Sequence, residues 1–453
     1  MTDSTTKNAI AGRGWIVGVL GAALLLSACQ EADTVLPGQR ETVRSVLQNP
    51  GELDLGTVAF SGNTSRAISL PGQVNNSNWT HTTGTPANRI SNATLRGNPQ
   101  LVWSANIGEG DSRKQRITAT PVVSAGRIIT LDADALVTAT ATSGATLWTR
   151  NLRPQTDQAG DATGGGLAVD GDTIYVSIGY GVLAALDATN GAVRWTQKLD
   201  ASGAGTPTVS GDLVYLTAGD DTGWAVRKSD GRVEWQIGAT SDGNNVLGAP
   251  APAISKDLAI FAFGSGEVQA VFRRGGLNRW DASVLGKRPG RAISNVSDVT
   301  AAPVISGDKV YVGNQSGRIV AMELGSGARV WTARDGAIGP VWPAGDSVFA
   351  VTDLNELVRL DASDGAKIWG VELPNFVKAK PKRQSRIFAH YGPIIAGSRL
   401  IIASNDGLLR SYDPANGALL GTSAIPDGAT TAPVVAGGTL YVVSSGGQLH
   451  AFR

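Results

Sequence analysis

The sequence repeats the pattern LVRLDASDGAKIW (357–369), in which an alternating segment runs into an acidic turn, a glycine and, four positions later, a tryptophan. The same spacing occurs in VLAALDATNGAVRW (182–195) and IVAMELGSGARVW (319–331). Alternation of apolar and polar residues predicts half-buried strands, and Asp and Gly supply the backbone angles of hairpin turns. The pattern therefore predicts a strand, a tight turn and a second strand that ends near the tryptophan.

This unit recurs along most of the chain. Seven tryptophans stand in the same register, namely Trp103, Trp148, Trp195, Trp235, Trp280, Trp331 and Trp369. An eighth, degenerate unit is LLRSYDPANGALLG (408–421), where Gly421 replaces the tryptophan. A second marker, a short strand headed by proline or an apolar residue as in APVISGDKVYVG (302–313), recurs in phase with the first. Repeats of about 40–50 residues with four short strands each are typical of β-propeller blades.

The two ends of the repeat region complement each other. The last unit stops at QLHAFR (448–453), which matches the third strand of a blade. The missing fourth strand, which carries the tryptophan, is present at PQLVWSANIG (99–108). Pairing of these segments would leave no large open sheet edge. We therefore predict an all-β fold, a single eight-bladed β-propeller closed by pairing of an N-terminal strand with the C-terminal blade.

Composition agrees with this fold and excludes several function classes. Glycine accounts for 58 of 453 residues, and only 17% of residues are charged, which is low for a globular protein. The 39 basic and 38 acidic residues are balanced, so nothing indicates a nucleic-acid partner. A single cysteine excludes a disulfide within one chain, and with three scattered histidines it excludes a zinc site of the usual spacing. No cofactor is predicted.

The N-terminus carries a targeting signal. Lys7 and Arg13 precede an apolar stretch from Trp15 to Leu26, which is too short to cross a bilayer comfortably but suits a secretory signal. The stretch runs into LSAC (26–29), which resembles a bacterial lipobox with Cys29 as the lipid-modified residue. The alternative is ordinary cleavage beside a chance cysteine. In the lipoprotein sorting rule that this resembles, a residue other than Asp after the cysteine, here Gln30, implies the outer membrane.

Three segments follow from these signals. Residues 1–28 are predicted to be a lipoprotein signal peptide, 29–95 a lipid-anchored tether and lead-in of polar composition, and 96–453 the propeller. Removal of residues 1–28 takes Lys7, Arg13 and Asp3 from the 39 basic and 38 acidic residues and leaves 37 of each. The expected mature protein is a neutral propeller anchored to the outer membrane and facing the periplasm.

The tryptophans allow two interpretations. A ring that recurs in the same register of every blade is suited to packing between neighbouring blades, where its large area stabilises the core. Aromatic side chains can also line a ligand site. The shared register favours the structural interpretation.

The repeat resembles the pyrroloquinoline-quinone-type propeller repeat. Together with the lipobox, the leader LPGQRETV (36–43) and all eight units, it is similar to the BamB-type lipoproteins of the outer-membrane β-barrel assembly machine. This resemblance implies a non-catalytic scaffold that docks on the periplasmic part of the pore subunit (BamA-like) and assists insertion of β-barrel proteins, with contact to unfolded outer-membrane proteins left open.

Two alternatives remain at this stage. One is a periplasmic quinoprotein dehydrogenase, a family that uses a vicinal disulfide and a calcium ion beside a catalytic Asp. The chain has one cysteine, and its acidic pairs, such as Asp132 and Asp134, fall at predicted turns. The other alternative is a ligand-binding propeller, because propeller loops make docking surfaces without catalytic groups.

The resemblance also implies a partner face. BamB-type proteins contact the pore subunit through loops between middle blades, which match NNVLGAPAP (244–252) and ISNVSDVTAAP (293–303) here. Asp298 matches the family pattern, whereas the family's second acidic position falls on Thr300 and its basic position falls on Leu247. We therefore expect Asp298 to pair with a basic group of the partner, and Val246 and Leu247 to make apolar contacts. The alternative is that Asp298 caps a turn and Leu247 packs under its own loop. A basic insert, KAKPKRQSR (378–386), is either a solvated loop or a contact for anionic lipid or an acidic surface.

Overall fold

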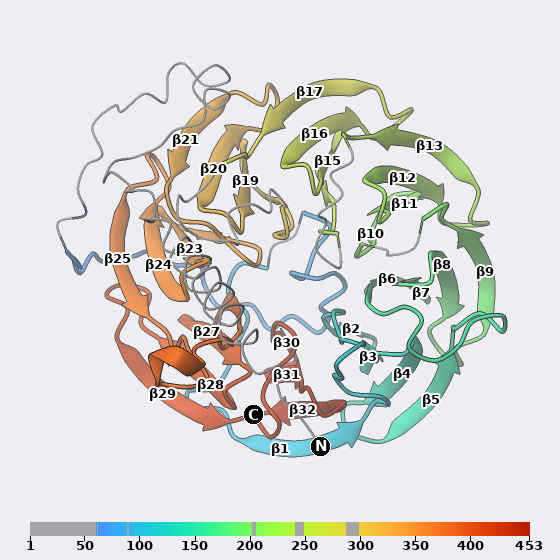
Figure 1. The fold of residues 1–453 in the computed structure, drawn as a ribbon, viewed down its shortest axis with the longest axis horizontal. Coiled ribbons are helices and arrows are strands. Elements are labelled where there is room, and N and C mark those ends of the chain that lie inside the picture. The colour runs from blue at the N-terminus through green and yellow to red at the C-terminus, as the bar shows by residue number, and fades with distance from the viewer. Residues whose placement is uncertain (1–59, 61, 88–89, 202–204, 241–248, 287–298) are drawn as a thin grey trace, which may run out of the picture. The chain divides into compact units, whose positions relative to one another are not determined.

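Eight four-stranded antiparallel sheets form a ring in the computed structural model of the protein (Figure 1). The model describes residues 60, 62–87, 90–201, 205–240, 249–286 and 299–453. The chain divides into two compact units, residues 1–56 and 57–453, and every described residue belongs to the second. No α-helix occurs among the described residues. The prediction of an all-β, eight-bladed propeller is confirmed.

Each of blades 1 to 7 uses four consecutive strands, the first nearest the centre of the ring and the last at the rim, and in blade 8 the rim strand is β1 (Figure 1). Blade 1 comprises β2 (Val122–Ser124), β3 (Arg127–Leu131), β4 (Leu136–Ala141) and β5 (Thr146–Asn151), and blade 2 comprises β6 (Gly165–Asp170), β7 (Thr173–Ile178), β8 (Val182–Asp187) and β9 (Val193–Lys198). Blade 3 comprises β10 (Thr208–Ser210), β11 (Leu213–Thr217), β12 (Thr222–Arg227) and β13 (Val233–Gly238), and blade 4 comprises β14 (Ala253–Ile254), β15 (Leu258–Ala262), β16 (Glu267–Phe272) and β17 (Asn278–Ser283).

The second half of the ring follows the same order. Blade 5 comprises β18 (Val304–Ser306), β19 (Lys309–Asn314), β20 (Arg318–Glu323) and β21 (Arg329–Ala333), and blade 6 comprises β22 (Trp342–Ala344), β23 (Ser347–Val351), β24 (Glu356–Asp361) and β25 (Lys367–Glu372). Blade 7 comprises β26 (His390–Ala396), β27 (Arg399–Ser404), β28 (Leu408–Tyr412) and β29 (Leu419–Ala424), and blade 8 comprises β30 (Val434–Ala436), β31 (Thr439–Val443), β32 (Gln448–Phe452) and β1 (Leu101–Asn106).

Each repeat tryptophan reaches from its own blade into the next. The indole Nε1 of Trp195 donates a hydrogen bond to the carbonyl of Lys228 at 2.9 Å, and that of Trp331 donates to the carbonyl of Ala362 at 3.0 Å. The other five rings make the same kind of bond to a neighbouring turn, with acceptors Thr142, Ala188, Arg273, Leu324 and Pro414. The rings therefore link consecutive blades through the backbone.

The repeat glycine is the surface on which the preceding tryptophan packs. Gly191 and Gly365 have positive φ angles, and a methyl group added to either would lie 2.5 and 2.6 Å from the rings of Trp148 and Trp331. No side chain larger than hydrogen fits there, and the positive φ is itself unfavourable for other residues. The glycine and the tryptophan of one repeat therefore do not pack on each other. Each glycine packs against the tryptophan of the previous blade.

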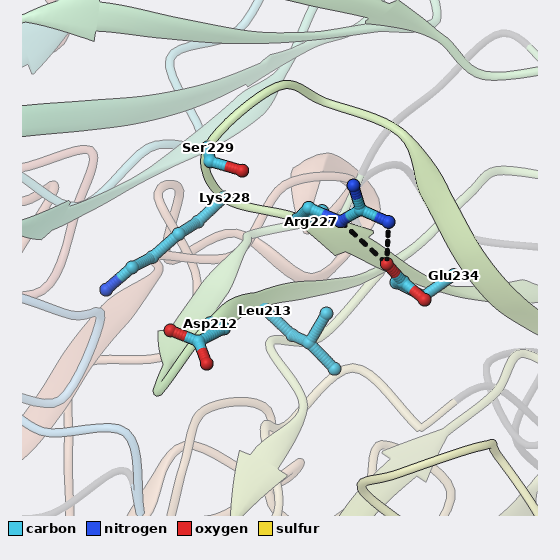
Figure 2. A pocket seen from close by; sticks show the side chains of 6 residues that line it. All are labelled: Asp212, Leu213, Arg227, Lys228, Ser229 and Glu234. Carbon is cyan, nitrogen blue, oxygen red and sulfur yellow. Dashed lines mark hydrogen bonds and ion pairs between the residues drawn. The ribbon is translucent and has the colours of Figure 1, made fainter.

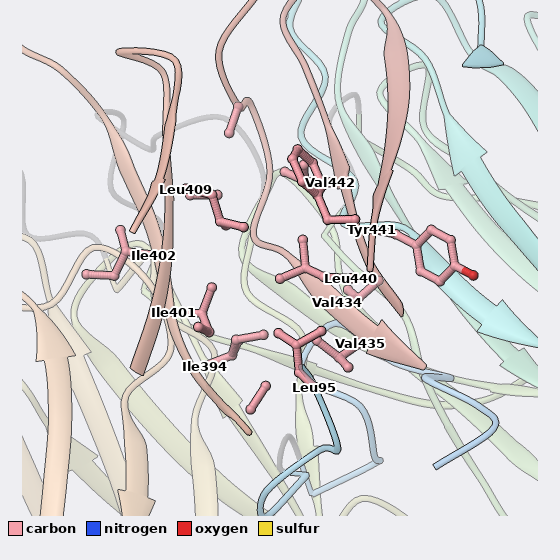
Figure 3. Close-up of a cluster of buried hydrophobic side chains, with 14 of the residues drawn as sticks. Leu95, Ile394, Ile401, Ile402, Leu409, Val434, Val435, Leu440, Tyr441 and Val442 are labelled. Carbon is pink, nitrogen blue, oxygen red and sulfur yellow. The ribbon is translucent and has the colours of Figure 1, made fainter. Parts of the chain in front are cut away.

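The ring closes as predicted. Strand β1 pairs antiparallel with β32, with Trp103 opposite Ala451 and Ser104 opposite His450. The packed side chains between blades 7 and 8 form one continuous cluster, in which Ile401 and Leu409 face Val434 and Leu440 (Figure 3). The first strand of the propeller therefore completes the last blade.

The segment before β1 runs through the centre of the ring (Figure 1). Trp79 is 1% exposed and stacks on Trp342 of β22 with ring centroids 6.4 Å apart. Its backbone pairs with Val123 of β2 through two hydrogen bonds of 2.8 Å. We call residues 62–87 and 90–95 the axial segment. Its first residues contact the outer strand β25, and its contacts from Val74 onward are mainly with the inner strands of the blades.

The axial segment satisfies the free edges of the inner strands. The residues at the same register position of successive inner strands are Val123, Val169, Val209, Ile254, Ile305, Pro343, Ile395 and Val435. The first five donate their N–H groups to Trp79 O, Thr80 O, His81 Nε2, Pro86 O and Ala87 O. The carbonyls of Ile395 and Val435 accept from Ala93 N and Asn76 Nδ2. The remaining position is Pro343, which has no N–H to satisfy.

Deletion of residues 97–106 should destabilise the whole ring, because it exposes the edge of β32 and removes Trp103 from Gly144. Loss of a packed aromatic side chain and a strand pairing should cost about 3 kcal/mol or more. Urea denaturation followed by circular dichroism measures this. Deletion of residues 379–385, around the 3-10 turn Pro381–Arg383 in the loop before blade 7, is the matched control and should leave the midpoint unchanged. Equal midpoints for the two deletions would contradict the closure.

Acid should weaken the axial contacts through His81. Its Nε2 lies 3.1 Å from both the backbone nitrogen and the carbonyl oxygen of Val209, and burial lowers its pKa from the usual 6.5 to about 4. Between these values the unfolded chain binds a proton that the folded chain does not, so stability is full above pH 6.5 and falls as the pH drops toward 4.

The expected loss is of order 3 kcal/mol at pH 4 for this one group. Denaturation midpoints at pH 7 and pH 4.5 for the wild type and His81→Gln measure it, since the variant lacks the titrating group and should show a shallower pH dependence. The same pH dependence in both proteins would show that His81 titrates normally in the folded state.

Candidate partner-binding face

The blades present two ends to solvent. In an antiparallel blade the turns between the first and second strands and between the third and fourth lie at one end, which we call the turn face. The turns between the second and third strands lie at the other end with the loops that join one blade to the next. We call this end the loop face; it carries residues 249–252, 299–303 and 373–389. Both predicted partner loops and the basic insert therefore share one face.

The structure places one of the four predicted partner residues. Thr300 is half-buried, and its Oγ1 donates a hydrogen bond to the carbonyl of Ile338 at 3.1 Å. Val246, Leu247 and Asp298 lie outside the described residues. Thr300 thus ties the loop before blade 5 to the loop before blade 6, so these two loops form one continuous part of the loop face.

The described ends of both partner loops are buried in the ring. Val299 is fully buried in the core between blades 4 and 5, and the neighbouring Ala301 is 1% exposed. On the other loop, the carbonyl of Pro252 accepts a 2.7 Å hydrogen bond from Thr208 Oγ1. Each loop therefore joins the rigid ring at a fixed point.

The basic insert is a short two-stranded projection. Phe376 and Ile387 form an antiparallel bridge, and the N–H of Val377 donates to the carbonyl of Arg386 at 3.0 Å. A 3-10 turn, Pro381–Arg383, forms its tip. At its base, Asn355 Nδ2 donates to the carbonyl of Phe388 at 3.0 Å. The insert is therefore an ordered projection of the loop face.

A shallow hollow lies on the turn face of blade 3. Its lining residues are Asp212, Leu213, Arg227, Lys228, Ser229 and Glu234 (Figure 2). Arg227 pairs with Glu234 at 2.5 Å and Lys228 with Asp170 at 2.9 Å. These charges are satisfied within the protein, and the hollow is at the end of the blade away from the predicted partner loops.

The acidic pairs at turns serve the backbone. The carboxylate of Asp132 accepts hydrogen bonds from the N–H groups of Glu109, Asp134 and Leu136 at 2.7–2.8 Å. Burial nevertheless raises its pKa above the usual value. Asp134 pairs with Arg153, and no group of three or more potential metal-ligating His, Cys, Asp or Glu residues occurs in the part of the chain that the structure describes. The turn-forming role expected of Asp132 is thus visible in the structure.

Sequence reasoning missed the buried charge of Arg359. Arg359 is fully buried and stands opposite Trp369 in blade 6, where other blades mostly have alanine. Its Nε donates to Ser347 Oγ at 2.8 Å, and its Nη1 donates to carbonyls of Arg66 and Pro414. It therefore joins the axial segment to blades 6 and 7. The sequence does show this difference, because the segment VRLD (358–361) has arginine at the position where most other repeats have alanine.

The predicted signal peptide and lipidation site fall outside the described residues. Cys29 is not among the described residues. The described part of the chain contains no helix with the length and hydrophobicity that a bilayer crossing requires.

These features define a class of protein: an eight-bladed repeat propeller with an axial segment of its own chain and a projecting loop face. The family model described as outer membrane protein assembly factor BamB matches residues 133–371 and 376–453. The match covers more than half of the chain, which therefore belongs to this family. The predicted family is confirmed.

Named relatives span nearly the same region. An outer membrane protein assembly factor BamB from Shewanella oneidensis is 25% identical over 361 residues, which cover 78% of this chain and 88% of the relative. The protein of the same name from Escherichia coli K12 is 22% identical over 358 residues, with the same coverage of 78% and 88%.

Solved structures share the fold. BamB from Moraxella catarrhalis has a TM-score of 0.64 at 18% identity and covers 78% of this chain and 99% of its own. A europium-containing methanol dehydrogenase has a TM-score of 0.61 at 13% identity and covers 81% of this chain and 89% of its own. At these identities the likeness concerns the fold alone.

Proposed function

We propose that this protein is a non-catalytic lipoprotein scaffold of the outer-membrane β-barrel assembly machine. It docks through its loop face on the periplasmic part of the pore subunit and assists insertion of β-barrel proteins. The observation that carries this proposal is the family match, which extends over most of blades 1 to 8. Unfolded outer-membrane proteins are a second class of partner that the same surface could meet.

The proposed organisation keeps the three segments of the sequence. Residues 1–28 act as the signal peptide, residues 29–95 carry the lipid on Cys29 and lead into the ring, and residues 96–453 form the propeller. The protein is then held at the outer membrane and faces the periplasm. The contacts of residues 62–95 with the blades give the lead-in a second role, as the axial segment.

A scaffold fits the chemistry of the described residues better than a dehydrogenase does. The axial segment occupies the centre of the ring, and Trp79 stacks there on Trp342. The seven repeat tryptophans direct their Nε1 groups to backbone carbonyls of the next blade, in keeping with the structural role proposed for them.

Within the loop face, we assign the pore-subunit contact to Val246, Leu247, Asp298 and Thr300. The described ends of the two loops are fixed to the ring on its loop face, which favours one partner surface that meets both loops. Thr300 is already engaged with Ile338, which favours Asp298 and Leu247 as the residues that contribute most to binding.

The double variant Asp298→Ala, Leu247→Ala should bind the purified pore subunit at least about tenfold more weakly, because truncation of interface anchors commonly costs 2 kcal/mol or more. Biolayer interferometry measures the dissociation constant, and a melting curve checks the fold. The matched control is Asp230→Ala, Leu277→Ala, an exposed pair on the turn face of blades 3 and 4. Binding within a factor of about two of the wild type would remove this contact surface.

Cys29→Ser should abolish lipidation and move the protein from the outer-membrane fraction to the soluble periplasmic fraction, since the acyl chains supply most of the membrane affinity. Fractionation with immunoblotting and intact mass measurement test this. A Cys29→Ser protein that still sediments with outer membranes would show that a different anchor exists.

A further inference from the structure

We propose that the projection formed by residues 374–389, here called the basic arm, binds the anionic phospholipid surface of the membrane to which the protein is anchored. The inference goes beyond docking on the pore subunit. It rests on the lipidation of Cys29 for its geometry, and the experiment below separates the two.

The basic arm carries charge of one sign. Lys378, Lys380, Lys382, Arg383 and Arg386 are all exposed, and none forms an ion pair among the described residues. No Asp or Glu occurs in residues 374–389. Elsewhere in the ring, exposed cations are often paired, as Arg194 is with Asp172 and Asp187 at 2.8 and 2.7 Å. The arm is therefore a local positive surface on a chain whose total charge is nearly balanced.

Apolar side chains stand beside the cations. Phe376, Val377 and Ile387 are 41%, 39% and 48% exposed, all at the two strands of the arm. An exposed aromatic and aliphatic group next to several Lys and Arg is the combination that places a segment at the boundary between lipid headgroups and acyl chains. The cations attract the phosphate surface, and the apolar groups enter the interface below it.

The chain that leads to the proposed lipid anchor enters the ring beside this arm. Asn63 exchanges two 2.9 Å hydrogen bonds with the backbone of Gly370, and Thr64 N donates to Ile368 O at 3.0 Å. Going back from Thr64 toward Phe60, the chain therefore runs toward the end of β25 that continues into residue 374. The first described residues of the chain and the arm thus lie at the same rim of blade 6, toward the loop face.

Composition favours lipid over a folded acidic partner. Three of the five cations are lysines, which are depleted in protein interfaces because they are costly to order and desolvate. A charged lipid surface imposes no fixed geometry and attracts each Lys or Arg that reaches it. A covalent anchor raises the local concentration of the arm at the membrane, so a weak contact suffices.

The test uses the absence of any cysteine other than Cys29. In the lipidated full-length protein, Ser385→Cys places a free thiol on the arm and Ser229→Cys places one on the turn face of blade 3; both positions are exposed. Each is labelled with the polarity-sensitive dye nitrobenzoxadiazole and reconstituted into phosphatidylcholine vesicles with or without phosphatidylglycerol. We expect the label at 385 to shift to the blue only when phosphatidylglycerol is present and to return in high salt, and the label at 229 to stay unchanged.

Charge removal tests the same contact. The variant Lys380→Gln, Lys382→Gln, Arg383→Gln should lower the ratio of membrane-bound to free arm roughly a hundredfold, because each cation near an anionic surface contributes about 1 kcal/mol. The label at 385 reports this ratio. The matched control, Arg232→Gln, Lys256→Gln, Arg274→Gln, removes three exposed cations from the turn face of blades 3 and 4 and should have no effect.

The outcomes are separable. If the labelled protein does not float with pure phosphatidylcholine vesicles, the lipidation of Cys29 has failed rather than the role of the arm. If it floats but the label at 385 ignores phosphatidylglycerol, the inference is wrong. If that label responds only when purified pore subunit is added to neutral vesicles, the arm is a protein contact and the lipid assignment is overturned.

Discussion

The inner strand of each blade has one unpaired edge at the centre of the ring, and the structure depends on how those edges are satisfied. A buried N–H without a partner costs about 1–3 kcal/mol, so a ring of open edges would be expensive. Here the axial segment supplies acceptors to five inner strands in turn, from Val123 to Ile305, and Pro343 removes the need at a sixth. The axial segment thus supplies hydrogen-bond partners for the free edges of most inner strands.

The rim of the ring is held by a different device. Each tryptophan packs on the glycine of the next blade and bonds to its turn, so the angle between blades is fixed by a contact without room for adjustment. Gly421 of blade 7 marks the one place where this device is replaced. The next blade there has no turn between its third and fourth strands, because β32 and β1 come from opposite ends of the chain, and Gln100 and Arg453 exchange backbone hydrogen bonds instead.

The repeat made the blades predictable from sequence because glycine, tryptophan and alternation report local geometry. The axial segment was not predictable in the same way. Its contacts are backbone hydrogen bonds to residues that are remote in sequence, and a backbone acceptor leaves no trace in residue type. The traces that exist are indirect, such as Pro343 and the buried His81. The candidate site was also predictable only in part. Thr300 was singled out through the resemblance to a family pattern, whereas its hydrogen bond to Ile338 depends on two loops that are brought together only by the ring. Arg359 could have been noticed as a large charged residue in a position of small ones, but its partners could not.

The closure of blade 8 has a consequence for the order in which the protein can fold. Residues 101–106 are made early, yet their partner strand lies far later in the sequence, at residues 448–452. Local hairpins can form as synthesis proceeds, but this strand pairing must wait until residues 448–452 have been made, and contacts between residues so far apart in sequence slow folding. Until then the edge of β1 is open to pairing with other chains. The circular fold is therefore completed late, and a chain that stopped before residue 448 would keep seven blades' worth of sequence and lack the strand that closes the ring.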